Sequence, residues 1–319
     1  MFFTHDPRCL EHRVPPGFPE RPERLAELLP ALAGDPRLRA LDPRSAPGDD
    51  EVLAAAAAVH EPRYLERLRR AVERGDGLFD SADNPISGGS FRAAVGAAAA
   101  ALRALDEAVA EGEAGFAAIR PPGHHAERGH AMGFCFLNHA AIVAERAIVR
   151  HGLARVAIVD FDVHHGNGTQ HLFEERADVL YASLHQYPFY PGTGAAEERG
   201  RGAGEGFTVN VPLAAGVGDA EWISALERRV LPELERFAPE LLVVSAGFDA
   251  WRGDPLGGLR VGRQAYVRAG ELLRELAAAR CGGRSVALLE GGYDLAALPG
   301  LALSYLLGES PERETPRPQ

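Results

Sequence analysis

The sequence predicts an α/β protein with an open, mostly parallel sheet and helices on both of its faces. Apolar, β-branched runs such as 156–159 are typical of strands that are buried on both faces. Helical patterns alternate with these runs along the chain, and this alternation favours a parallel sheet. No linker rich in Pro, Gly or Ser divides the 319 residues. We therefore expect one domain over 1–308 and a disordered polar tail over 309–319.

Local signals along the chain predict each helix and strand. Proline and loop residues dominate 1–30 until a helical pattern starts near Glu23, and two short helical patterns follow within 51–75. A turn cluster over 83–90 precedes an alanine-rich helix over 93–110. The pattern then predicts strands at 115–120, 156–159, 178–184, 207–211, 241–245 and 285–289, and helices up to 151, from about 169, at 219–237, at 262–279 and before the tail.

Composition excludes some classes of function. The net charge is −11, the pI is near 5.6 and no strongly basic stretch occurs, so we expect no nucleic-acid partner. The apolar stretch 93–110 contains charged residues and the amino terminus lacks the apolar core of a signal peptide, so we expect no membrane association. Cys9, Cys135 and Cys281 lie far apart without a C-x-x-C pair. Together these features indicate a cytoplasmic protein.

Ionisable residues crowd the end of the strand that opens the segment 156–170, VAIVDFDVHHGNGTQ. Such groups are costly to bury without partners. Alternate residues of a strand share a face, so Asp160, Asp162 and His164 would point the same way if the chain stays extended. Gly166 and Gly168 then allow a turn before the next helix. A salt-bridged strand end is the simpler interpretation, but this density of Asp and His favours a metal site.

Polar residues follow four separate predicted strands. They are His124 and His125, the segment 160–165, Asp249, and Tyr293. Because a parallel sheet places the carboxyl ends of its strands on one edge, we expect these four groups to meet there.

Three of these residues are suitable ligands for a catalytic metal. Asp162, His164 and Asp249 leave a fourth position for water, which is the pattern of a catalytic zinc site. Zinc lowers the pKa of bound water to about 7. Ferrous iron suits the same ligands.

The remaining polar residues predict the rest of an amide hydrolase. His124 and His125 can accept a proton and return it to a leaving amine, and Asp160 and Asn167 can orient their rings. Tyr293 can polarise a carbonyl and stabilise an oxyanion. Each has a simpler alternative: a turn cap for Asp249, a solvated loop for the histidines, and packing for Tyr293.

Five motifs resemble the histone deacetylase superfamily, which includes lysine deacetylases and acetylpolyamine amidohydrolases. They are RPPGHHA, GFCFLN, VDFDVHHGNGTQ, SAGFDA and EGGYD, and they follow the family's order from near residue 20 to near residue 300. The resemblance implies an arginase-like open α/β fold and zinc-dependent deacetylation that releases acetate. We therefore expect an acyl-lysine peptide or protein as substrate.

The resemblance also implies a role for each matching residue. Zinc ligands would be Asp162, His164 and Asp249. The catalytic group would be His125 as general base and acid, His124 as its electrostatic partner bonded to Asp160, Tyr293 at the acetyl carbonyl, and Asn167 beside His125. A structural potassium or sodium ion would use Asp160, Asp162, His164, Ser183 and Leu184, largely through backbone oxygens. Phe134 and Tyr190 would wall the acyl-lysine tunnel, with the Gly133 carbonyl accepting the substrate amide hydrogen.

Three positions depart from parts of the family. Class I members have Asp where this chain has Asn167, and Asn should make His125 less basic. The wall residue at Tyr190 is often Phe. Polyamine-selective relatives place an acidic gatekeeper where this chain has Leu256, so the expected substrate is acyl-lysine, with acetylpolyamine hydrolysis as the alternative.

The sequence disfavours two other classes of function. An arginase-type enzyme needs further carboxylates for a second manganese ion, and Gly166 and Trp251 stand at those positions. An inactive acyl-lysine-binding module would lack Tyr293 or a ligand, and all of them are present.

Overall fold

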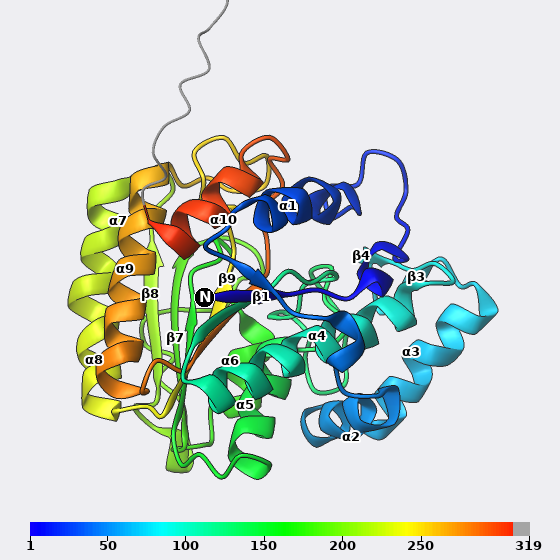
Figure 1. The fold of residues 1–319 in the computed structure, drawn as a ribbon, viewed down its shortest axis with the longest axis horizontal. Coiled ribbons are helices and arrows are strands. Elements are labelled where there is room, and N and C mark those ends of the chain that lie inside the picture. Colours follow the sequence, from blue (N-terminus) through cyan, green and yellow to red (C-terminus); the bar gives the residue numbers. More distant parts are fainter. Residues whose placement is uncertain (309–319) are drawn as a thin grey trace, which may run out of the picture.

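The fold is built on one sheet of eight strands in a computed structural model, which describes residues 1–308 (Figure 1). The predicted tail, 309–319, lies outside the described residues. The strands of this sheet are β1 (Phe2–Thr4), β2 (Arg39–Ala40), β5 (Ala114–Ala117), β6 (Val156–Asp160), β7 (Val179–Gln186), β8 (Thr208–Leu213), β9 (Leu241–Ala246) and β10 (Ser285–Leu289). Their order is β2-β1-β5-β10-β9-β6-β7-β8, and every neighbouring pair is parallel.

Helices cover both faces of the sheet, as the alternating pattern predicts (Figure 1). They are α1 (Glu23–Gly34), α2 (Asp49–Val59), α3 (Pro62–Arg74), α4 (Ser90–Glu111), α5 (His139–Val149), α6 (Asn167–Phe173), α7 (Asp219–Ala225), α8 (Leu231–Phe237), α9 (Arg263–Arg280) and α10 (Leu298–Leu307). Helices α4 and α5 pack on one face, and α7, α8 and α9 lie on the other. The central strands β6 and β9 are buried along their whole length, which explains the apolar runs 156–159 and 241–244 with which they begin.

Small side chains bring the long helix α4 close to the sheet. The run 97–101 is all alanine and fully buried, and α4 contacts β1, β5 and β10. The stretch over 93–110 is thus a packed helix, as predicted. In the described part of the chain, no helix is both long and apolar enough to cross a membrane.

Two predictions for the amino-terminal part missed short strands. The region 1–30 begins with strand β1 rather than a loop, and the cluster at 83–90 starts inside β4 (Ser81–Pro85), which pairs antiparallel with β3 (Leu78–Phe79). A strand of three residues is too short to show a period of two. Strand β1 is held by pairing with β5, where a Cβ on Gly115 would lie 2.2 Å from the Phe2 ring.

Several boundaries also differ from the prediction. Strand β5 ends at Ala117, β7 continues to Gln186, and α6 begins at Asn167, two residues earlier than expected. The helix expected over 219–237 is divided by a π-helical turn at Leu226–Val230, next to a proline at the start of α8. A proline cannot donate the backbone hydrogen bond that continues an α-helix.

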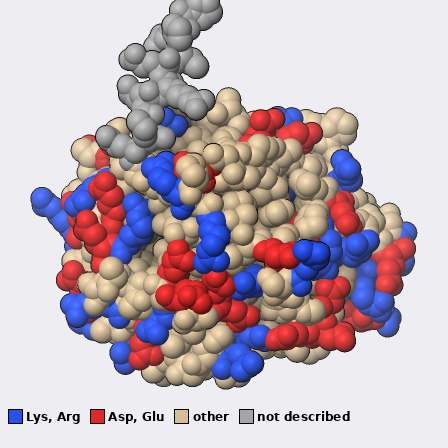
Figure 2. Space-filling model, viewed as in Figure 1, with Lys and Arg blue, Asp and Glu red and all other residues tan. Residues whose placement is uncertain are grey.

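The sheet brings the four predicted polar groups to one edge. Strands β5, β10, β9 and β6 are successive neighbours, and their carboxyl ends lead into the segments of His124, Tyr293, Asp249 and Asp162 respectively. The predicted convergence is therefore confirmed. On the face drawn in Figure 2, arginines are interspersed with Asp and Glu, so neither sign of charge dominates that face.

Candidate active site

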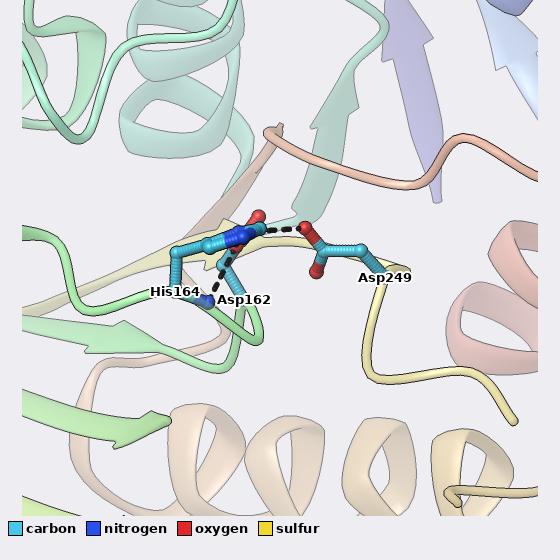
Figure 3. Close-up of side chains that lie close together, drawn as sticks. All are labelled: Asp162, His164 and Asp249. Atoms are coloured by element: carbon cyan, nitrogen blue, oxygen red, sulfur yellow. Dashed lines mark hydrogen bonds and ion pairs between the residues drawn. The ribbon is translucent and has the colours of Figure 1, made fainter. Parts of the chain in front are cut away.

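Two carboxylates and one imidazole meet just beyond the ends of β6 and β9. Asp162, His164 and Asp249 each offer a ligand atom, and these atoms lie within 4.8 Å of one another. The Nδ1 atom of His164 is 3.1 Å from Asp162 Oδ1 and 3.2 Å from Asp249 Oδ2 (Figure 3). The backbone orients both acids, since Gly291 N–H donates to Asp162 and Val163 N–H donates to Asp249.

This donor set fits a divalent cation. Both carboxylates are buried, and the Oδ2 atom of Asp249 has no well-oriented hydrogen-bond donor among the described residues. Burial and the nearby charge of Asp162 raise the pKa of Asp249 to about 7. Two buried carboxylates this close repel each other unless a cation compensates them. One imidazole nitrogen and carboxylate oxygens suit zinc or ferrous iron.

Asp160 does not join these three residues. Strand β6 ends at Asp160 and the chain then bends, so the alternation expected for Asp160, Asp162 and His164 is lost there. The Asp160 carboxylate instead lies 3.0 Å from His124 Nδ1 and accepts a hydrogen bond from the Tyr181 hydroxyl. This contact agrees with the prediction that Asp160 orients a histidine ring. The prediction that Asp160 points the same way as Asp162 and His164 was wrong, because the strand does not continue past Asp160.

The two adjacent histidines differ in charge. Burial opposes a charge on His124, but the Asp160 and Asp162 carboxylates outweigh it and raise its pKa to about 10. Burial and the neighbouring His124 and His164 hold the pKa of His125 well below its usual value. At neutral pH, His124 is therefore an imidazolium next to a neutral His125, at a ring-centroid distance of 4.0 Å.

His125 faces the pocket with one ring nitrogen engaged. Its Nδ1 lies 2.7 Å from Asn167 Oδ1, as the sequence predicts for an orienting partner. An amide oxygen can only accept a hydrogen bond, so Nδ1 carries the hydrogen and donates it, and Nε2 has a free lone pair. A Cβ on Gly133 would lie 2.2 Å from His125 Cδ2, so only glycine fits against the ring.

Tyr293 is held in place through the backbone around it. The Asp254 carboxylate accepts hydrogen bonds from the Tyr293 and Asp294 N–H groups. Arg24 donates to the Gly292 carbonyl at 2.7 Å, and its guanidinium lies 4.8 Å from the centre of the Tyr293 ring. The phenol is thus presented by a fixed loop, and burial raises its pKa well above the ordinary value, so it remains a proton donor.

A pocket of about 290 Å³ joins these groups. Its lining comprises Asp83, Pro122, His124, His125, Gly133, Phe134, His164, Tyr190, Leu256, Gly291 and Tyr293. All four residues predicted to form the tunnel (Gly133, Phe134, Tyr190 and Leu256) are therefore found on its wall. The predicted potassium-site residues Ser183 and Leu184 lie on β7, where Ser183 is paired with Asp160 of β6.

The sequence did not single out several residues that support the site. Glu290 accepts hydrogen bonds from the Gly123 and His124 N–H groups, and burial raises its pKa to about 7. Asp83 accepts from the Tyr190 hydroxyl at 2.9 Å and from Gly133 N–H at 3.0 Å. The only sequence signal for Glu290 was its place before Gly291-Gly292 at a strand end.

The match to known proteins covers most of the chain. A family model described as "Histone deacetylase domain" matches residues 18–307. The histone deacetylase-like amidohydrolase of Pseudomonas aeruginosa is 43% identical over 90% of this chain and 75% of its own length. Histone deacetylase 15 of Arabidopsis thaliana is 51% identical over 63% of this chain, which spans only 37% of that relative. The human polyamine deacetylase HDAC10 is 40% identical over 91% of this chain and 45% of its own length.

Solved structures have the same architecture. The crystal structure of the HDA15 HD domain matches with a TM-score of 0.85 and 39% identity over 97% of this chain and 88% of that one. An acetylpolyamine aminohydrolase from Burkholderia pseudomallei matches with a TM-score of 0.82 and 34% identity over 97% and 98% of the two chains. The open parallel sheet is thus the arginase-like fold that the motifs imply. The chain belongs to the histone deacetylase family, a family of hydrolases.

Proposed function

We propose that this chain is a metal-dependent deacetylase that hydrolyses the amide of Nε-acetyl-lysine in peptides or proteins and releases acetate. One observation carries the proposal: the same pocket is lined by His164, which lies between two buried carboxylates, and by His125 and Tyr293. Residues 1–308 are proposed to form the single deacetylase domain.

The metal is proposed to be held by Asp162, His164 and Asp249. Zinc fits this set, and ferrous iron is the other candidate. When bound there, the ion supplies Lewis acidity toward an amide carbonyl and makes water more acidic. The Oδ2 atom of Asp249, buried without a well-oriented donor among the described residues, supports this assignment.

The proton-transfer residues are proposed to be His125, with Asn167, and His124, with Asp160. His125 takes a proton at Nε2 and returns it to the leaving lysine amine. Burial, together with the positive charges of His124 and His164, lowers the pKa of His125, which favours its neutral form before it accepts the proton. Tyr293 donates its hydroxyl hydrogen to the acetyl carbonyl oxygen, where negative charge develops.

The tunnel walls are proposed to select an acyl-lysine side chain. Phe134 and Tyr190 offer apolar faces to its methylene groups, and the Gly133 carbonyl accepts the hydrogen of the substrate amide. Leu256 places an apolar side chain where a polyamine-selective relative would have a carboxylate. The lysine chain loses contact with water along this tunnel, which favours binding.

Two further expectations are proposed with the function. A potassium or sodium ion is expected at backbone and side-chain oxygens of Asp160, Asp162, His164, Ser183 and Leu184. A cytoplasmic location is supported by the three free cysteines, which fit a reducing compartment. Neither a nucleic acid nor a membrane is expected as a partner.

An acetylpolyamine is the alternative substrate, and Asp83 favours it. This carboxylate lines the pocket and could attract a cationic amine. It is already engaged by the Tyr190 hydroxyl and the Gly133 N–H, however, which leaves less of it for a substrate. Two relatives are named for acetylpolyamine hydrolysis, so the rates on acetyl-lysine peptides and acetylpolyamines should be measured side by side.

A substrate panel tests the proposal. Purified enzyme is stripped with a chelator, reloaded with zinc or ferrous iron, and assayed for acetate release from acetyl-lysine peptides, acetylputrescine and acetylspermidine. We expect peptides to have the highest kcat/KM, and His125→Ala to lower kcat by about 100-fold or more. The chain contains no lysine, so its own acetylation adds no background. Faster cleavage of the polyamines would favour the alternative, and no acetate from any substrate would contradict both.

A further inference from the structure

The side-chain amide of Asn167 contacts two hydrogen-bond acceptors on the side opposite His125. Its Nδ2 atom donates to Glu127 Oε1 at 2.6 Å and lies 3.4 Å from the sulfur of Met132. A carboxylate and a thioether are both acceptors without a proton to donate. They therefore admit only the NH₂ end of the amide, and they direct its oxygen toward His125 Nδ1, 2.7 Å away.

The direction of this amide decides which nitrogen of His125 carries the proton. With the Asn167 oxygen facing it, Nδ1 must donate, and Nε2 is left unprotonated toward the pocket. With the amide reversed, its NH₂ group would face Nδ1, which would then have to accept, and the proton would move to Nε2. A general base with its pocket nitrogen already protonated cannot accept a proton.

Glu127 is itself well anchored. Its Oε1 also lies 2.8 Å from Nδ1 of His171, which is four residues after Asn167 on the same face of α6. Its backbone N–H donates to the His130 carbonyl, and its own carbonyl lies 2.9 Å from His60 Nδ1. The carboxylate is thus held by His171 and the backbone of Glu127 by two further contacts, so the carboxylate can impose a direction on the amide.

We propose that Glu127 is a positioning residue: it fixes the Asn167 amide so that His125 keeps its proton on Nδ1 and presents a free Nε2 to the substrate. This inference rests on the proposed role of His125 as general base. A carboxylate at position 167 would have two equivalent oxygens and would need no such partner. Asparagine does need one, because its two ends differ.

The first test exchanges an acceptor for a donor. Glu127→Lys offers only N–H groups and should turn the amide oxygen away from His125. We expect kcat for an acetyl-lysine peptide to fall about 10-fold to 100-fold while KM stays within about threefold. Glu127→Gln can still offer an oxygen, so it should retain kcat within about threefold. Glu175→Lys, at an exposed glutamate just beyond the same helix, is the matched control.

In an Asn167→Asp protein, Glu127→Lys should no longer lower kcat. Both ends of the new carboxylate accept, so Nδ1 of His125 remains protonated whatever stands at 127. A glutamate there would repel the new carboxylate, and a lysine would pair with it. We expect Glu127→Lys to leave kcat unchanged or higher in this background. An equal loss in both backgrounds would mean that Glu127 only stabilises the loop, and it would overturn the proposal.

A spectroscopic readout separates this inference from the proposed function. Nitrogen-15 NMR of the zinc-loaded protein, labelled in its histidines, reports which ring nitrogen carries hydrogen. His125→Ala identifies the resonances. We expect hydrogen on Nδ1 in the parent and on Nε2, or a mixture, in Glu127→Lys. An unchanged pattern would overturn the inference even if the enzyme is active. Should Glu127→Lys not fold, Glu127→Ala removes the acceptor and should give a mixture of the two His125 tautomers.

Discussion

Glycine at position 291 leaves the space in which two carboxylates meet. A Cβ there would lie 2.1 Å from Asp249 Oδ2 and 2.6 Å from Asp162 Oδ2. We therefore expect Gly291→Ala to displace both acids and to lower zinc affinity by about 10-fold or more. Metal content measured by mass spectrometry after dialysis against a competing chelator checks this.

A glycine without close neighbours provides the control for that substitution. A Cβ on Gly34 would have no other atom within 4 Å, so Gly34→Ala should bind zinc like the parent chain. Equal zinc affinity of Gly291→Ala and the parent would show that the acids at 162 and 249 do not share a metal.

The hydroxyl of Tyr190 restrains a wall of the pocket. It donates to Asp83, which belongs to a different segment of the chain. Tyr190→Phe keeps the aromatic face and removes only this bond, whose loss is worth about 1 kcal/mol, or roughly a factor of five. We expect kcat/KM for butyryl-lysine relative to acetyl-lysine peptides to rise by about that factor, because the wall can then move.

Paired kinetics on the two acyl peptides measure this ratio. Tyr187→Phe removes a hydroxyl from a tyrosine that does not line the pocket and should leave the ratio unchanged. A ratio that is the same in Tyr190→Phe and in the parent would mean that the wall is fixed by packing alone.

At the scale of elements, strand β4 fixes the conformation of the segment that carries Phe134. Its residues Asp83 and Asn84 accept hydrogen bonds from the Gly133 and Phe134 N–H groups, at 3.0 and 2.8 Å. Phe134 has a φ of 68°, which non-glycine residues adopt at a cost. The antiparallel hairpin thus compensates for strain in the tunnel wall.

Removal of one of these acceptors should loosen that wall. We expect Asn84→Ala to lower the free energy of unfolding by about 1–3 kcal/mol, because the Phe134 N–H loses its buried acceptor. We also expect KM for an acetyl-lysine peptide to rise by more than kcat falls. Urea unfolding and steady-state kinetics measure the two effects. Unchanged stability and KM would show that the Phe134 conformation does not depend on β4.

At the scale of the whole molecule, buried neutral histidines make stability depend on pH. Burial lowers the pKa of His12, His60 and His139 to about 4 from 6.5. Between pH 6.5 and 4 the unfolded chain binds a proton at each position and the folded chain does not. Stability is therefore complete above pH 6.5 and is lost as the pH falls toward 4, by roughly 3 kcal/mol for each histidine.

Replacing one of them should flatten this dependence. We expect His60→Gln to reduce the slope of unfolding free energy against pH by about 1.4 kcal/mol per pH unit between pH 4.5 and 6. Urea unfolding of the zinc-loaded protein at several pH values gives the slope. His130→Gln, at an exposed histidine, is the control. Equal slopes for the parent and His60→Gln would contradict the assignment.

Short-range signals explain which elements could be predicted. Strands β6, β9 and β10 each contain a run of four apolar residues (156–159, 241–244 and 286–289), so their pattern is visible without knowledge of their neighbours. Strands β1 and β2 have three and two residues, and each depends on a neighbour that is distant in sequence: β1 pairs with β5, and β2 pairs with β1. The bend after β6 likewise could not be seen in the residues that precede it.

The sequence by itself determined the kind of site: metal-binding residue types at the ends of apolar strands, in motifs whose order matches the histone deacetylase family. Those groups depend on residue identity and on strand direction, both of which are local. The tertiary structure alone decided which groups support them. Glu290 meets His124 across 166 residues, Arg24 meets Gly292 across 268, and Glu127 meets Asn167 across 40. Such contacts depend on how distant segments pack, and no local pattern encodes that packing.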